Sequence, residues 1–361
     1  MFLRPALASK ALAVLFLAAG LAPAQPLFQA LFELKEMDLH LHAGMEREIE
    51  MKDWIDLAVN DGRKVILLLD HLELYRKSQQ EYEAWRAKGN FQARYPLGAS
   101  GRQALMAGFD EAARRRDVIL FKGWEVYEGE LDTGLEAAPL RLADVIGFHI
   151  SPNHGRAAPN GRTLIKRVKQ IREAQKQFPV PMILFHPFTM RLENLQRTAT
   201  NTGRDPKTLT VQEYRFFQPG EQEQLAGLLK NTSIYIEISR STERYFADPV
   251  CREALIADIK PLAEAGVQFT ISTDNHNVGS AKMPFTPSLC ADALGVTPLN
   301  TNAIVRELLA LRARRSLASS IHGIVRATGD IDLVADLRST PQAPDRPPSM
   351  RNPVQFSPNC R

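Results

Sequence analysis

Seven apolar runs of strand length end at, or carry near their end, a histidine or an acidic residue. In Val267–His276, β-branched and aromatic residues are followed by Asp274 and His276, and this composition is typical of a buried strand. Because side chains two apart on a strand lie on one face, these two ionisable groups would point the same way. The other six runs are Glu33–His40, Lys64–Leu69, Val118–Phe121, Asp144–Phe148, Pro181–Phe185 and Ile234–Ile238.

Stretches with helical spacing of apolar residues separate these runs. They are Met51–Asp61, Ala104–Arg116, Ile165–Gln177, Gln222–Lys230 and Val250–Ala265. Alternating strands and helices predict parallel βα units, and seven of them favour a closed barrel over an open sheet. Barrel enzymes place their chemistry where the strands end at the C-terminal face. We therefore predict an α/β fold, a seven-stranded (βα)7 TIM-like barrel with its site at the strand ends.

The first 24 residues have the composition of a signal peptide. Arg4 and Lys10 form its positive region, Ala11–Leu21 its apolar core and Ala22–Ala24 a small-residue cleavage site. The apolar run is too short for a comfortable membrane span, and the alternative is a retained N-terminal anchor. We expect the mature protein to begin near Gln25, to have no stable membrane span and to be periplasmic or secreted.

The rest of the chain is predicted to form one domain followed by a tail. Residues 25–338 are expected to form the barrel domain, with the helices after residue 299, including Ala303–Leu317, packed outside the barrel. Residues 339–361 are rich in proline and poor in large apolar side chains, a composition typical of a disordered tail. Two longer connections, Glu73–Gly101 and Met190–Gly220, follow strand ends and are candidates to overhang the site.

Charge and cysteine content exclude some classes of function. The formal net charge of +4, to which the signal segment contributes Arg4 and Lys10, does not favour nucleic acid binding. Three cysteines are too few for a disulfide framework, although Cys251 and Cys290 could pair in an oxidising compartment, leaving Cys360 over. The sequence does not indicate the oligomeric state.

The strand ends together predict a metal site. Imidazole and carboxylate ligands suit zinc, manganese or iron, and Glu125 and Asp274 are carboxylates that can bridge two cations. A single histidine at a strand end is more often structural, but six of the eight histidines end five of the seven strands. These six are His40, His42, His71, His149, His186 and His276.

The pattern resembles the polymerase and histidinol phosphatase (PHP) superfamily over roughly Leu31–Gly279. The motifs are His-x-His in the first run, Asp-His after the second, Gly-x-Glu in the third, His after the fourth, His-Pro after the fifth and Asp-x-His in the seventh. The resemblance implies a distorted seven-stranded barrel that holds up to three divalent metals.

The resemblance also implies a ligand set. One metal would be held by His40, His42, Glu125 and Asp274, a second by Glu125, His149 and His186, and a third by His71 and His276. Members of the superfamily usually carry an Asp or His in the loop after His-x-His. Here Glu46 is the nearest substitute, with Glu48 behind it, so the third site is expected to be weaker or differently filled.

The predicted chemistry is metal-assisted hydrolysis of a small-molecule phosphate ester. A water bridging two of the two or three divalent ions (Mn, Zn or Fe) can lose its proton near neutrality and attack phosphorus. Glu125 and Asp274 are the predicted catalytic carboxylates, because they hold the cations in place. Arg240 and Lys282 follow the last two strands and are candidates to bind phosphate. Asp38, two residues before His40, would either support the ligands or be a buried hydrogen-bonding acid. Glu237 in the sixth run would either contact metal-bound water or close a core network.

Two alternatives remain open on the sequence. The first is a hydrolase of the amidohydrolase type acting on C–N or C–O bonds, a family that also opens with His-x-His. Such enzymes commonly use a bridging lysine on the fourth strand, where this chain has His149. The second is a metal-binding protein without catalysis, to which the altered loop at Glu46 points.

Export is directly testable. N-terminal sequencing of the protein purified from its native host should start near Gln25, because the small residues at Ala22–Ala24 mark the cleavage site. Soluble cytoplasmic protein that keeps Met1 would contradict the predicted location.

Overall fold

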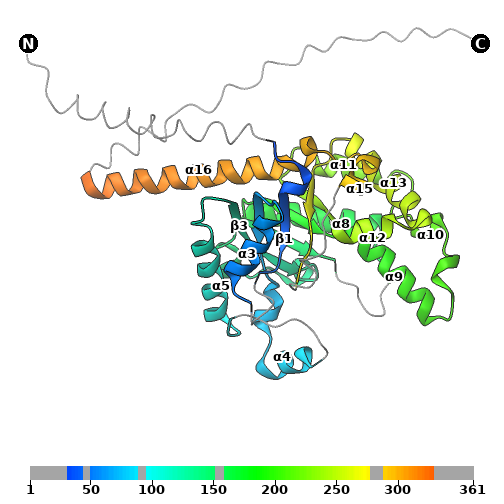
Figure 1. Ribbon diagram of the computed structural model, residues 1–361, viewed down its shortest axis with the longest axis horizontal. Coiled ribbons are helices and arrows are strands. Elements are labelled where there is room, and N and C mark those ends of the chain that lie inside the picture. The colour runs from blue at the N-terminus through cyan, green and yellow to red at the C-terminus, as the bar shows by residue number, and fades with distance from the viewer. Residues whose placement is uncertain (1–30, 44–48, 88–94, 151–157, 277–287, 329–361) are drawn as a thin grey trace, which may run out of the picture. The chain divides into compact units, whose positions relative to one another are not determined.

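The computed structural model describes residues 31–43, 49–87, 95–150, 158–276 and 288–328. Within them, seven parallel strands form one sheet in sequence order, which confirms the predicted TIM-like α/β barrel (Figure 1). The strands are β1 Met37–Leu41, β2 Val65–Leu68, β3 Ile119–Tyr127, β4 Val145–His149, β5 Met182–Phe185, β6 Ile234–Ser239 and β7 Phe269–Ser272.

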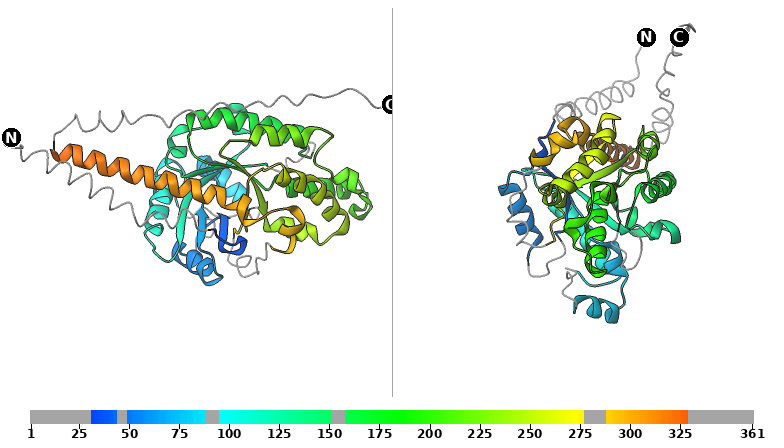
Figure 2. Two further views of the ribbon diagram at one scale, coloured as in Figure 1. Left: turned by 90° about the horizontal axis from the view of Figure 1, so that it is seen from above. Right: turned by 90° about the vertical axis from the view of Figure 1, so that its right-hand side faces the viewer.

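Helices connect successive strands and cover the sheet. Figure 1 shows α3 and α5 on one side of the strands and α8, α12 and α13 on the other, and Figure 2 shows the same elements from two further directions. The helices of this part are α3 Met51–Asn60, α4 Gln79–Arg86, α5 Ala99–Ala112, α6 Glu130–Thr133, α7 Ala137–Leu140, α8 Gly161–Gln177, α9 Pro187–Asn201, α10 Val211–Tyr214, α11 Glu221–Leu229, α12 Arg240–Phe246, α13 Pro249–Glu264 and α15 Ser288–Leu294. Short 3-10 turns are η2 Leu34–Glu36, η3 Leu72–Arg76 and η4 Pro206–Thr208.

The chain divides into two compact units at Ala310. The first holds the barrel and its helices. The second begins at Leu311, within the long helix α16 Pro298–Thr328. Among the described residues, no helix is both long enough and apolar enough to span a bilayer.

Three details differ from the sequence-based expectation. The first run begins not with a strand but with η2, because Glu33 and Glu36 form a reciprocal capping box there. The connection after residue 190 contains most of α9, which starts with a proline at its first position. Cys251 and Cys290 are both buried free thiols, so the pairing that the sequence allowed does not form, and Cys360 lies outside the described residues.

The first and last strands meet and bring the barrel close to closure. The backbone N–H of His42 donates to the carbonyl of Asn275 at 3.0 Å, and the N–H of Asp274 donates to the carbonyl of His40 at 3.0 Å. Because these bonds lie where β1 and β7 end, they place the His-x-His and Asp-x-His motifs beside each other.

Asp38 reinforces this seam as a buried hydrogen-bonding acid, one of the two roles that the sequence left open for it. Its carboxylate accepts hydrogen bonds from the backbone N–H of Thr273 at 2.9 Å and from the Thr273 hydroxyl at 2.6 Å. The pairing register of β1 shifts between Asp38 and Leu41, and such an irregularity interrupts the strict alternation of faces on which the other role rested. Its Oδ1 also accepts the backbone N–H of His40 at 3.4 Å, so the buried acid joins the edge strands and contacts the backbone of a predicted ligand.

A glycine inside the barrel makes room for a ring under the histidines. A Cβ added to Gly147 of β4 would lie 1.8 Å from a ring carbon of Phe185. The Phe185 ring is fully buried and packs on the His40 imidazole with 3.8 Å between ring centroids. The absence of a side chain at residue 147 thus lets Phe185 support His40 from below.

We expect Gly147→Ala to lower the free energy of unfolding by about 1–3 kcal/mol, because Phe185 has no free space to move into. Gly227→Ala in α11 is the matched control, since nothing lies within 4 Å of its added Cβ, and replacing a helical glycine stabilises by roughly 0.5–1 kcal/mol. Urea denaturation measures both. Equal effects of the two substitutions would show that Gly147 is not a packing requirement.

Candidate metal centre

The predicted ligands converge at the C-terminal ends of the strands. His40 lies in β1, His42 directly follows β1, and Glu125 lies in β3; all three are at most 1% exposed. The remaining ligands end or follow their strands: His149 ends β4, His71 follows β2, His186 follows β5, and Asp274 and His276 follow β7. Parallel strands in a barrel point their C-terminal ends to one face, and this is why residues up to 236 positions apart in the chain meet.

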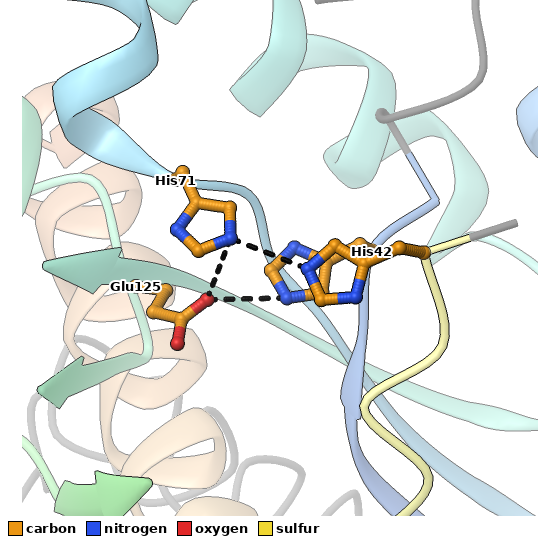
Figure 3. Close-up of side chains that lie close together, drawn as sticks. His42, His71 and Glu125 are labelled. Atoms are coloured by element: carbon orange, nitrogen blue, oxygen red, sulfur yellow. Dashed lines mark hydrogen bonds and ion pairs between the residues drawn. The ribbon is translucent and has the colours of Figure 1, made fainter. Parts of the chain in front are cut away.

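Glu125 is the centre of the cluster. One oxygen, Oε2, lies 3.1 Å from Nε2 of His42, 3.2 Å from Nε2 of His71 and 3.4 Å from Nε2 of His40. The other oxygen, Oε1, lies 3.2 Å from Nδ1 of His149 and 3.5 Å from Nε2 of His186. Figure 3 shows the rings of His42 and His71 directed at this carboxylate. The two oxygens thus face two different sets of imidazoles.

Asp274 faces the His-x-His pair from the end of the neighbouring strand β7. Its Oδ1 lies 3.4 Å from Nε2 of His40 and 3.6 Å from Nε2 of His42, and the two Nε2 atoms are 2.9 Å apart. On the other side of His42, the Nε2 atoms of His71 and His276 are 3.3 Å apart. In both groups, nitrogen or oxygen atoms that can bind a metal lie close to one another.

Several of these contacts are not hydrogen bonds. Oε1 of Glu125 and Oδ1 of Asp274 are buried and have no aligned hydrogen-bond partner, although ring nitrogens lie nearby. Around a cation with ligands at about 2.0–2.2 Å, tetrahedral geometry separates neighbouring ligand atoms by about 3.3–3.6 Å. Five of the nine separations given above lie in this range, and the other four, between 2.9 and 3.2 Å, are shorter. Four overlapping groups of described residues have suitable spacing: His42, His71, Glu125 and His276; His40, His42 and Asp274; His40, His186 and Glu237; and His71, Glu73 and His149.

Glu237 of β6 fixes the orientation of His40. Its Oε1 lies 2.7 Å from Nδ1 of His40 and also accepts the Ser272 hydroxyl, and its Oε2 accepts the backbone N–H of His186 at 2.7 Å. A carboxylate behind a histidine holds the outer ring nitrogen protonated, so that the inner nitrogen is free to bind a metal. Glu237 therefore completes the buried network, one of the two roles expected of it.

The backbone at two predicted ligands is left-handed. His186 has φ of 37° and Asp274 has φ of 55°, a conformation that costs a non-glycine residue of order 1–3 kcal/mol and is concentrated at functional sites. At His186 the bond from Glu237 holds this turn, and at Asp274 the bond to His40 does so. Both turns bring the side chain to the cluster.

The electrostatics of the cluster show how strongly the groups interact. Burial alone would lower the pKa of His71, but the charges of Glu125 and Glu73 outweigh it and raise this pKa to about 10. Burial alone would raise the pKa of Glu125, and the charges of His71, His40 and His149 instead hold it well below its usual range. The carboxylate is thus ionised and requires positive charge around it.

Of the other predicted site residues, only Arg240 lies in the part of the chain that the structure describes. Arg240 begins α12 and is partly buried; burial lowers its pKa, and the charges of Asp38 and Asp274 oppose this shift. The Arg240 guanidinium is therefore close enough to the cluster for the charge of Asp274 to act on it. Glu46 and Lys282 lie outside the described residues.

Glu73 was missed by the search for ligands in the sequence. It lies in η3, directly after β2, and its Oε1 is 3.2 Å from Nδ1 of His71 and 3.5 Å from Nε2 of His149. The available signal was its position two residues after His71, the same spacing as in His-x-His and Asp-x-His.

Comparison with known proteins gives structural matches of low sequence identity. No protein-family model and no curated sequence matches the chain. Among solved structures, a histidinol phosphate phosphatase from Lactococcus lactis subsp. lactis Il1403, complexed with zinc, L-histidinol and phosphate, matches with 13% identity and a TM-score of 0.41, covering 72% of this chain and 94% of that one. A Xaa-Pro dipeptidase with bound methionine matches with 11% identity and a TM-score of 0.33, covering 79% and 75%. At these values neither match tells what the chain does.

Metal content tests the cluster. Purified, metal-replete protein should carry two or three divalent ions per chain, and replacing both His40 and His42 by alanine should lower this number, because both rings face the Asp274 oxygen. Elemental analysis measures it. Chelation should lower the melting temperature of the wild type, since a bound ion stabilises the fold by mass action, and should affect the double variant less. A wild type without metal under replete conditions would contradict the assignment.

Proposed function

We propose that the chain is an exported, PHP-type metal-dependent phosphoesterase. The observation that carries the proposal is the arrangement around Glu125, where each carboxylate oxygen faces a separate set of imidazoles. A carboxylate shared in this way suits two adjacent cations, and paired cations about 3.5–4 Å apart are typical of phosphatases and nucleases. The motif order along the chain supports the same family.

The residues present fit divalent ions of the zinc and manganese type. His40, His42, Glu125 and Asp274 would hold one ion, and Glu125, His149 and His186 a second. His71 and His276 would hold a third, against the same Glu125 oxygen that His42 faces. When bound, such ions polarise phosphoryl oxygens and lower the pKa of water.

The protein's own contribution is placement and charge. Glu125 fixes the spacing of the two imidazole sets, and Glu237 and Phe185 hold His40 in one orientation. Arg240 supplies positive charge near Asp274, where a phosphoryl group bound at the cluster would bring negative charge. We assign Arg240 to binding of the phosphate ester, and Lys282 to the same task on sequence grounds. Preorganised charge of this kind needs no reorientation during the reaction.

Glu125→Gln tests the proposal. It keeps the side-chain volume but removes the charge between the two imidazole sets, so one cation should be lost or weakly held. Phosphate release from a panel of phosphomonoesters and phosphodiesters, at saturating manganese and at saturating zinc, should fall by roughly two orders of magnitude or more.

The matched control is Glu223→Gln, which removes the same charge from an exposed position on α11 and should leave the rate unchanged. Full activity of Glu125→Gln would contradict the paired-metal mechanism. A wild type that hydrolyses amides but no phosphate esters would instead favour the amidohydrolase alternative, and a metal-loaded wild type inactive on both would favour metal binding without catalysis.

A further inference from the structure

Glu73 occupies a position behind two predicted ligands. Its Oε1 lies 3.2 Å from Nδ1 of His71 and 3.5 Å from Nε2 of His149. The opposite nitrogens of the same two rings, Nε2 of His71 and Nδ1 of His149, each lie 3.2 Å from an oxygen of Glu125. The two imidazoles are therefore bracketed by an inner carboxylate, Glu125, and an outer one, Glu73.

This bracket constrains the tautomer of each ring. A neutral imidazole that binds a cation through one nitrogen carries its proton on the other. If the inner nitrogens bind cations, the outer proton is on Nδ1 of His71 and on Nε2 of His149, and Glu73 is the carboxylate nearest to both. Nδ1 of His71 and Oε2 of Glu73 are buried without an aligned partner, and buried polar groups are paired in nearly all proteins.

The alternative, in which Glu73 is itself a ligand, is chemically less favourable. A cation held among Glu73, Nδ1 of His71 and Nε2 of His149 would leave only the inner nitrogen of each ring for a proton. Both rings would then have to be imidazolates whenever the inner nitrogens also bind cations. The inner contacts to Glu125 are at least as short as the outer ones, so the inner nitrogens are the better candidates for coordination.

The backbone holds Glu73 in this place. Its 3-10 turn, η3, starts directly after His71 and buries Leu72, Leu74 and Tyr75. The Tyr75 hydroxyl donates to Asp70 at 2.9 Å, and Asp70 also accepts the backbone N–H of His71 at 2.7 Å. A carboxylate on an anchored turn can orient other groups, whereas a carboxylate on a loose loop orients them poorly.

We propose that Glu73 is a positioning residue of the metal centre: it accepts the outer N–H of His71 and of His149 and so directs the inner nitrogen of each toward Glu125 and the cations. The inference rests on the metal centre of the proposed function and not on the phosphoesterase reaction. In this proposal, the single carboxylate of Glu73 selects the tautomers of two histidines that follow or end different strands.

The test combines zinc affinity with a direct view of the tautomers. In zinc-loaded protein labelled with 15N-histidine, long-range 1H–15N spectra should show His71 protonated on Nδ1 and His149 on Nε2. Glu73→Leu should weaken zinc binding by roughly 10–100-fold and blur these tautomers, while the number of ions at saturation stays the same. Glu73→Gln, whose amide oxygen still accepts, should restore the tautomers and much of the affinity.

Glu83→Leu is the control, since Glu83 is an exposed acid on α4 and its loss should change neither readout. The proposal is overturned if Glu73→Leu binds zinc as the wild type does with unchanged tautomers, which would make Glu73 an ordinary surface acid. It is also overturned if Glu73→Gln loses one ion per chain at saturation, which would make Glu73 a direct ligand. Both readouts are independent of phosphate release, so a failure of the phosphoesterase proposal would be seen separately.

Discussion

The buried carboxylate of Glu125 is the group on which the rest of the site depends, because its charge must be paired. Ring nitrogens of five described histidines lie within 3.5 Å of its oxygens, while only 1% of the residue is exposed. Removing an ionised carboxylate from water costs several kcal/mol unless it is paired. Neutral imidazoles alone cannot supply the pairing charge, so the cluster must take up protons or cations. Divalent cations satisfy the carboxylate and the inward lone pairs of the imidazoles together.

The barrel brings these groups together through its edges as well as its strands. His-x-His and Asp-x-His lie at the ends of the first and last strands. They meet because backbone hydrogen bonds and the contact of Asp38 with Thr273 join these two ends. Behind them, Glu237 links His40, the turn at His186 and Ser272. The same contacts that close the barrel therefore set the geometry of the predicted ligands.

Much of this arrangement could be predicted from the sequence because it depends on two short-range patterns. Alternating apolar runs and helices specify the barrel, and ligand types at the ends of the runs specify the face on which they meet. Asp38 shows where this reasoning stops, since the sequence left it as either a support for the ligands or a buried hydrogen-bonding acid. The folded chain decides between these roles through a register shift in β1 and the contact of Asp38 with Thr273. No local pattern reveals such a shift.

Glu73 shows a second limit. In the sequence it is one acid at the start of a polar connection, and only the folded chain places it behind rings from β2 and β4. Likewise, the role of Gly147 depends on Phe185, which lies on the next strand and packs on a histidine from the first. Contacts of this kind depend on three strands at once and are not encoded in any single stretch.

The central claim is that cations occupy the space between the two imidazole sets of Glu125. Anomalous diffraction from crystals of metal-replete protein, recorded on both sides of the zinc absorption edge, tests it most directly. The account predicts separate peaks about 2.0–2.2 Å from each oxygen of Glu125, one toward His40 and His42 and the other toward His149 and His186. Zinc-replete crystals with no anomalous peak at Glu125, or with peaks only elsewhere on the molecule, would contradict it.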